Sequence, residues 1–122
     1  MAPSRLRIFH CDDSVAFTRL VRHWLGEHPE LEHVGSAHTG AEALELLPQA
    51  RPDVVLLDTM GNPGDRALVD AIRAAVPGAH VIVYSGYVRL AARGLIDNGA
   101  DAYLEKGDDE DALVRAIHEV AG

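Results

Sequence analysis

The sequence of 122 residues contains 11 lysine and arginine residues against 19 aspartate and glutamate residues, which gives a formal net charge of −8. This balance argues against nucleic-acid binding by the chain, because such binding is dominated by contacts between cationic side chains and phosphates. With Cys11 as the only cysteine and no apolar run long enough to cross a membrane, we expect one domain, residues 1–122, in the cytoplasm.

The first predicted element is a mostly apolar strand over residues 6–11 that ends in two acids, Asp12 and Asp13. Ser14 is a suitable cap for the helix that follows, and Gly26 marks the end of that helix. The helix has one apolar face at the spacing i, i+3, i+4, i+7, i+8, formed by Phe17, Leu20, Val21, Trp24 and Leu25.

A weaker strand is predicted over residues 31–37, followed by a second helix. Thr39 is its expected cap, with Glu42 three residues on as in a capping box. Pro48 and Pro52 are expected to bracket the link to the next strand.

Four consecutive apolar residues, 54–57, predict a short strand buried on both faces, as in a parallel sheet covered by helices. Asp58 follows this strand directly. In open parallel sheets, ligands bind outside the carboxyl ends of the strands, so Asp58 is expected at the edge where chemistry takes place.

The second half of the chain repeats the pattern. A helix with Leu68, Ala71, Ile72 and Ala75 on one face precedes a strand over residues 79–84, after which comes Ser85. A loose helical segment around residues 91–95 leads to a short strand, 102–104, which runs into Lys106. Asp108 or Asp109 starts the last helix, whose inner face is formed by Leu113, Ala116, Ile117 and Val120.

Five strands alternating with five helices predict a doubly wound α/β fold, because parallel strands need helical crossovers. The polar residues that follow the strands would then share one edge of the sheet. They are Asp12, Asp13, Asp58, Ser85 and Lys106.

Clustered carboxylates repel one another unless a cation lies among them, and hard oxygen ligands favour Mg²⁺. No cysteine and histidine pair has zinc-site spacing. If a phosphoryl group bridged the metal and Lys106, Asp58 could attack it to form an aspartyl phosphate. Ser85 could then bind a phosphoryl oxygen through a hydrogen bond.

The acid pair after the first strand, Asp58, Ser85 and the sequence Tyr-Leu-Glu-Lys at 103–106 together resemble the receiver domain of two-component response regulators. The resemblance spans the whole chain. It implies a flavodoxin-like sheet of five parallel strands in the order 2-1-3-4-5. It also implies that Asp58 takes a phosphoryl group from the histidine of a sensor kinase or from a phosphotransfer protein.

The resemblance further implies a role for each matching residue. Asp13 and Asp58 would ligate Mg²⁺ directly, Asp12 largely through water, and Met60 through its backbone carbonyl. Lys106 and Ser85 would bind the phosphoryl group, and Ser85 and Tyr103 would form the switch. That switch would alter the surface of the fourth helix, fifth strand and fifth helix, which an output domain or effector protein reads.

Parts of the sequence depart from the family pattern. Gly61, Asn62 and Arg66 replace the usual Met, Pro and Gly in the loop after the acceptor, and Gly107 replaces a frequent proline after Lys106. A residue other than proline there is familiar among receivers that precede LuxR-like DNA-binding domains. Met60 and Tyr87 lie two residues beyond Asp58 and Ser85, where bulky side chains would hinder water, so we expect slow dephosphorylation.

The main interpretation is a phosphorylation-dependent switch, whose chemistry is self-phosphorylation and slow self-dephosphorylation rather than enzymatic turnover. The alternative is a pseudo-receiver, a docking or dimerisation module in which the altered loop disables magnesium binding. A phosphatase with Asp58 as nucleophile is disfavoured, because the second acid of an Asp-x-Asp pattern is absent. The chain ends where the last helix should end, which suits a stand-alone receiver or a piece of a longer regulator, and a homodimer through the first or last helices stays open.

Overall fold

The computed structural model describes residues 5–58, 66–85, 99–106 and 109–121. Its strands are β1 (Leu6–Cys11), β2 (Leu31–Ala37), β3 (Val54–Leu57), β4 (His80–Ser85) and β5 (Ala102–Glu105). Its helices are α1 (Val15–Gly26), α2 (Gly40–Ala50), α3 (Arg66–Ala75) and α5 (Glu110–Ala121). Within these ranges, no helix combines the length and the apolar character needed to span a bilayer.

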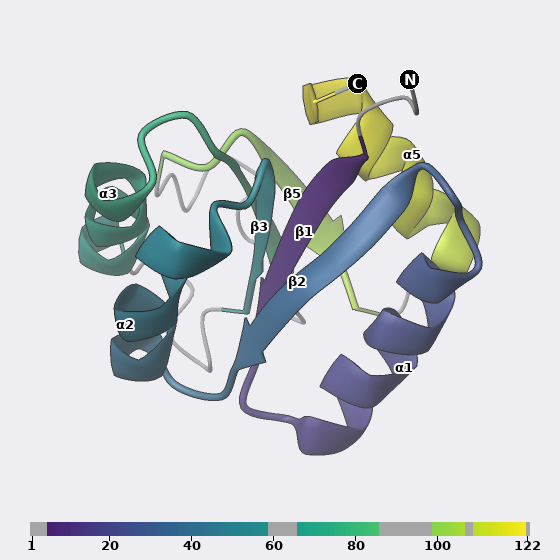
Figure 1. The fold of residues 1–122 in the computed structure, drawn as a ribbon, viewed down its shortest axis with the longest axis horizontal. Coiled ribbons are helices and arrows are strands. Elements are labelled where there is room, and N and C mark those ends of the chain that lie inside the picture. Colours follow the sequence, from purple (N-terminus) through teal and green to yellow (C-terminus); the bar gives the residue numbers. More distant parts are fainter. Residues whose placement is uncertain (1–4, 59–65, 86–98, 107–108, 122) are drawn as a thin grey trace.

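The five strands form one parallel sheet in the order β2-β1-β3-β4-β5 (Figure 1), which confirms the predicted fold class and strand order. Four helices are described where five were predicted. The helical segment predicted around residues 91–95 lies outside the described residues, and the helix numbering therefore passes from α3 to α5.

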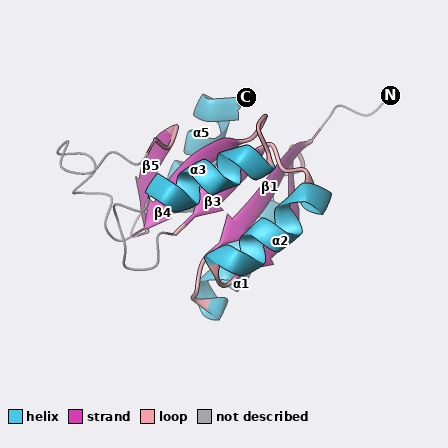
Figure 2. Ribbon diagram, turned by 90° about the vertical axis from the view of Figure 1, so that its left-hand side faces the viewer, coloured by secondary structure: helices cyan, strands magenta, loops and turns pink. Residues whose placement is uncertain are grey.

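The sheet is the middle of three layers, with α2 and α3 on one face and α1 and α5 on the other (Figure 2). Strand β3 contributes side chains to the hydrophobic cores on both faces of the sheet. Val55 and Leu57 face α2 and α3, whereas Val54 and Leu56 face α1 and α5. All four side chains are fully buried, as predicted for a strand covered on both faces. The same alternation places His10 and Cys11 on opposite faces of β1.

Side chains expected to cap helices do so. The Ser14 hydroxyl accepts a hydrogen bond from the amide of Phe17 at the start of α1, and the Thr39 hydroxyl accepts one from Glu42 at the start of α2. The Asp109 carboxylate accepts a hydrogen bond from the amide of Ala112, which makes Asp109, of the two candidates, the residue that caps α5. Each cap fixes where the helix begins relative to the strand before it.

Two details of the prediction are wrong. Leu20 is 41% exposed rather than part of the buried face of α1, and Thr18 is buried instead. Its hydroxyl donates to the carbonyl of Val15 at 2.8 Å, so a polar side chain can lie in the core without losing its hydrogen bond. Helix α2 also continues through Pro48, because burial of Leu47 and packing of Ala50 on either side offset the one backbone hydrogen bond that proline removes.

Candidate functional site

Three aspartates meet at the carboxyl edge of the sheet. Oxygen atoms of Asp12, Asp13 and Asp58 all lie within 4.8 Å of one another. Asp12 is fully buried and Asp58 is 5% exposed, whereas Asp13 is exposed. The sheet itself sets this geometry, because the Asp12 amide donates to Ala37 on β2 and the Asp58 amide donates to Cys11 on β1.

Lys106 brings a positive charge to this group from the end of β5. Its Nζ lies 2.9 Å from Oδ2 of Asp12 and 2.8 Å from Oδ2 of Asp58. The Lys106 side chain is 27% exposed, so the ammonium is partly removed from water while it bridges two buried carboxylates. The predicted meeting of these residues at one edge is therefore what the structure shows.

The protonation states of the site follow from these contacts. Burial raises the pKa of Asp12, but the nearby His10 imidazole, the Lys106 ammonium and the Ser14 amide outweigh burial and bring the pKa to about 2. Burial lowers the pKa of Lys106, yet its bonds to Asp58 and Asp12 raise that pKa above the usual value. At neutral pH Asp12 is thus a carboxylate and Lys106 an ammonium.

The donor set fits a small divalent cation. The three carboxylates and one ammonium carry a combined formal charge of −2, and all of the carboxylate donors are hard oxygens that suit Mg²⁺. A metal here would be held by Asp12, Asp13 and Asp58, and would neutralise negative charge on an incoming phosphoryl group. Among the described residues, this is the group of acidic, histidine and cysteine side chains with metal-site spacing.

The other predicted site residues are placed in part. Ser85 is the last residue of β4 and pairs with Glu105, which brings its backbone beside Lys106 at the same edge. Tyr103 is half-buried in β5 and pairs with Val83 of β4. Met60 and Tyr87 lie outside the described residues, so their predicted roles stay predictions.

Three side chains that sequence reasoning did not assign to the site lie directly beneath it. The rings of His10, Phe17 and Tyr84 are neighbours, with centroids 5.2 to 6.3 Å apart. His10 is fully buried, and its Nε2 is 3.6 Å from Oδ2 of Asp12, beyond hydrogen-bond length. A histidine in an apolar strand just before two acids was the available signal for this neighbourhood.

Cys11 lies on the other face of β1 and is buried. Burial, together with the nearby carboxylates of Asp12 and Asp58, raises the pKa of its thiol to about 12. The thiol therefore stays protonated at neutral pH.

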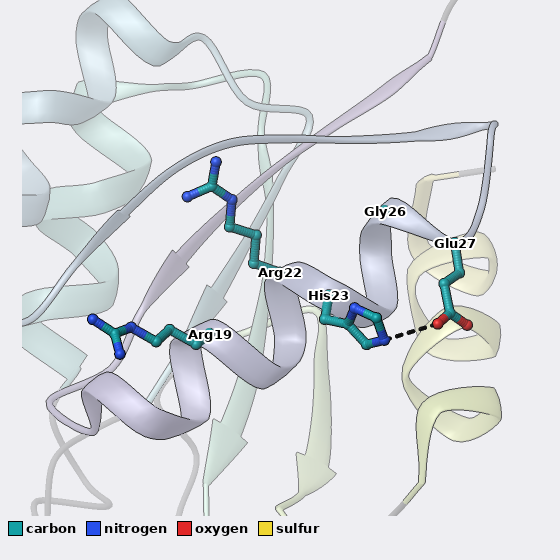
Figure 3. Close-up of a pocket in the computed structure, with 5 residues that line it drawn as sticks. All are labelled: Arg19, Arg22, His23, Gly26 and Glu27. Carbon is teal, nitrogen blue, oxygen red and sulfur yellow. Dashed lines mark ion pairs between the residues drawn. The ribbon is translucent and has the colours of Figure 1, made fainter.

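A separate hollow lies on the surface of α1 (Figure 3). It is lined by Arg19, Arg22, His23, Gly26 and Glu27. The arginine side chains extend away from the pair formed by His23 and Glu27, whose Nε2 and Oε1 atoms are 2.9 Å apart. The one carboxylate in this lining is already paired with His23, so the hollow does not offer the set of oxygen ligands that a metal needs.

Comparison with known proteins agrees with the geometry. The sequence model described as "Response regulator receiver domain" matches residues 8–118, so the chain belongs to the family of response regulator receiver domains. The receiver domain of the putative response regulator NarL from Mycobacterium tuberculosis is 29% identical. Its structure matches with a TM-score of 0.80 over 98% of each chain.

Two curated relatives are longer proteins. The chain is 32% identical to a protein-glutamate methylesterase/protein-glutamine glutaminase of a Nocardioides strain, covering 94% of the chain and 32% of that protein. It is 33% identical to the transcriptional regulatory protein DegU of Brevibacillus brevis, covering 97% of the chain and 51% of that protein. The chain thus spans about a third to a half of these two relatives.

Proposed function

We propose that residues 1–122 form one receiver domain, which accepts a phosphoryl group on Asp58 from a histidine kinase or a phosphotransfer protein in the cytoplasm. An oxygen of Asp58 forms a bond to phosphorus as the phosphorus–nitrogen bond of a phosphohistidine breaks. The released imidazole nitrogen takes a proton from solvent. The product is an acyl phosphate that water later hydrolyses.

One observation carries this proposal: the Lys106 ammonium bridges Asp12 and Asp58 at the point where three carboxylates converge. A phosphoryl group at Asp58 would lie between that ammonium and the cation held by the carboxylates. Positive charge on both sides would stabilise the charge that spreads over the phosphoryl oxygens during transfer.

The remaining predicted residues complete the proposed site. Ser85 would bind a phosphoryl oxygen, Met60 would give its carbonyl to Mg²⁺, and Tyr103 would turn inward when Ser85 moves. Such a switch is a shift between two populations, driven by bonds that the phosphoryl group makes in one of them. The surface it changes includes β5 and α5.

The proposed activity is self-phosphorylation and slow self-dephosphorylation, without a separate enzymatic reaction. DegU is named as a transcriptional regulator and the Nocardioides relative as a methylesterase, so related receivers are joined to different outputs. We propose that this receiver acts on an output domain or an effector protein, of which the output domain of a LuxR-like DNA-binding regulator is one case. The net charge of −8 supports contact with a protein rather than nucleic acid through the receiver itself.

The test is intact mass after incubation with acetyl phosphate, with and without Mg²⁺. We expect the wild-type protein to gain one phosphoryl group when Mg²⁺ is present, and Asp58→Asn to gain none. Asp70→Asn is the matched control, because Asp70 is an exposed aspartate on α3 and should leave the gain unchanged.

No gain by the wild-type protein in either condition would overturn the proposal. That result would favour the pseudo-receiver alternative, which the unusual residues Gly61, Asn62 and Arg66 support. A gain that persists in Asp58→Asn would mean that another side chain is the acceptor.

A further inference from the structure

The ring of Phe17 lies against the charged end of Lys106. The Nζ atom of Lys106 is 5.0 Å from the centroid of the ring, within the range in which an ammonium is attracted to an aromatic face. Phe17 is half-buried on α1, and Lys106 is the only lysine in the sequence. Lys106, the one lysine of the chain, thus connects the end of β5 to helix α1 through its contact with Phe17.

The position of Phe17 is fixed by the site itself. One oxygen of Asp12 accepts a hydrogen bond from the Ser14 amide at 2.8 Å, and the Ser14 hydroxyl accepts one from the Phe17 amide at 3.2 Å. The other oxygen of Asp12 pairs with Lys106. These four residues therefore form a closed ring of contacts, in which the backbone of Phe17 and the ammonium it faces are tied to the same carboxylate.

The aromatic ring of Phe17 also packs against two other rings. Its centroid is 5.2 Å from that of Tyr84 and 5.9 Å from that of His10, with the His10 ring nearly perpendicular to it. Both partners are fully buried in the sheet. Phe17 therefore packs on two buried rings of the sheet, which limit the positions that its side chain can take.

We propose that Phe17 is a positioning residue, whose aromatic face holds the Lys106 ammonium where it can meet a phosphoryl group on Asp58. The carboxylates that now hold Lys106 are the ones expected to hold Mg²⁺, so the ammonium shares them with a cation. The face of Phe17 is not shared in this way. The Phe17 ring holds Lys106 through a cation–π contact rather than through a hydrogen bond. The N–H donors of the ammonium therefore remain available for oxygen atoms.

The first test reads the contact itself in metal-free protein. Because the chain has one lysine, protein labelled with ¹³C and ¹⁵N lysine gives side-chain NMR signals from Lys106 alone. We expect the signals of its terminal CH₂ group to be displaced by the Phe17 ring current. The displacement should persist in Phe17→Tyr and be lost in Phe17→Leu, and its persistence in Phe17→Leu would overturn the proposal.

The second test, which rests on the function proposed above, measures the rate of phosphorylation by acetyl phosphate. We expect Phe17→Leu to be slower by about threefold to tenfold, the change that corresponds to a cation–π contact of this kind. Phe17→Tyr should retain the rate, and so should Leu20→Ala, an exposed change on the same helix. A wild-type rate in Phe17→Leu would overturn the proposal.

A third variant separates charge from shape. Fluorinated phenylalanines introduced at position 17 keep nearly the same volume but weaken the negative potential of the ring face. The rate should fall stepwise with each fluorine, whereas a purely structural role for Phe17 predicts no change. If the wild-type protein is not phosphorylated at all, the proposed function fails, and the NMR measurement still decides the contact between Phe17 and Lys106.

Discussion

Aspartates occupy both ends of the parallel strands, in different surroundings. At the amino ends, Asp53 precedes β3 and accepts a hydrogen bond from the Arg7 amide of β1 at 2.8 Å. Asp101 precedes β5 and accepts one from the Val81 amide of β4, also at 2.8 Å, together with one from Arg73. At the carboxyl ends, carboxylate oxygen atoms of Asp12, Asp13 and Asp58 lie within 4.8 Å of one another.

The two ends differ in how many hydrogen-bond donors are available to each carboxylate. Each aspartate at the amino ends meets a backbone amide that would otherwise lack an acceptor, so its charge is used to hold strands in register. At the carboxyl ends, three carboxylates share one described ammonium, and repulsion among them is relieved by a cation. The aspartates at the amino ends thus stabilise strand pairing, whereas the three carboxylates and one ammonium at the carboxyl ends leave a formal charge of −2 that a cation would neutralise.

The largest expected effect is at the amino ends. Asp101→Ala should lower the free energy of unfolding by about 3 kcal/mol, because the fully buried Val81 amide loses a charged acceptor and Arg73 loses one of its two acceptors. Urea unfolding measures the change. Asp70→Ala is the control, since its contact with Arg66 is an exposed pair at 3.8 Å and should matter by less than about 0.5 kcal/mol. Equal effects of the two variants would contradict this account of the amino ends.

Acid should reveal how the surroundings of Asp12 stabilise its carboxylate. The pKa of Asp12 in the folded state is about 2, below its ordinary value of 3.8, so the ionised group stabilises the fold above pH 3.8. That contribution, about 2 kcal/mol, is lost as the pH falls from 3.8 through 2. Urea unfolding of metal-free protein across this range should show it, and Asp12→Asn should show a shallower loss. A variant as steep as the wild type would place the titration elsewhere.

Replacing an aspartate by asparagine should change the free energy of unfolding in opposite directions at the two ends of the strands. In metal-free protein, Asp58→Asn should raise the free energy of unfolding by about 1 kcal/mol, because it removes one of three repelling carboxylates while Lys106 keeps Asp12. Asp53→Asn should lower it, because the Arg7 amide loses a charged acceptor. Added Mg²⁺ should stabilise the wild type more than Asp58→Asn. A loss of stability in Asp58→Asn would mean that its bond to Lys106 outweighs the repulsion.

The sequence was sufficient to predict the strands, the caps and the shared edge, because each depends on local pattern. Asp58 after an apolar run is visible without any tertiary information, and strand ends in a parallel sheet meet by geometry. Which side chains of α1 face the core was less predictable. Thr18 is buried in place of Leu20, because its hydroxyl forms a hydrogen bond within its own helix. The contact of Phe17 with Lys106 was not predictable either, since it depends on how a helix and a distant strand pack.

The smallest expected effect concerns water at the carboxyl ends. An acyl phosphate on Asp58 would be exposed to hydrolysis there, and the sequence places the bulky residues Met60 and Tyr87 two positions beyond Asp58 and Ser85. Tyr87→Ala should speed dephosphorylation by about threefold, which corresponds to a barrier lower by about 0.7 kcal/mol. Loss of the phosphoryl group, followed by intact mass after removal of acetyl phosphate, gives the rate. Tyr87→Phe should stay slow, because bulk rather than the hydroxyl excludes water, and a Tyr87→Ala rate equal to the wild type would rule this shielding out.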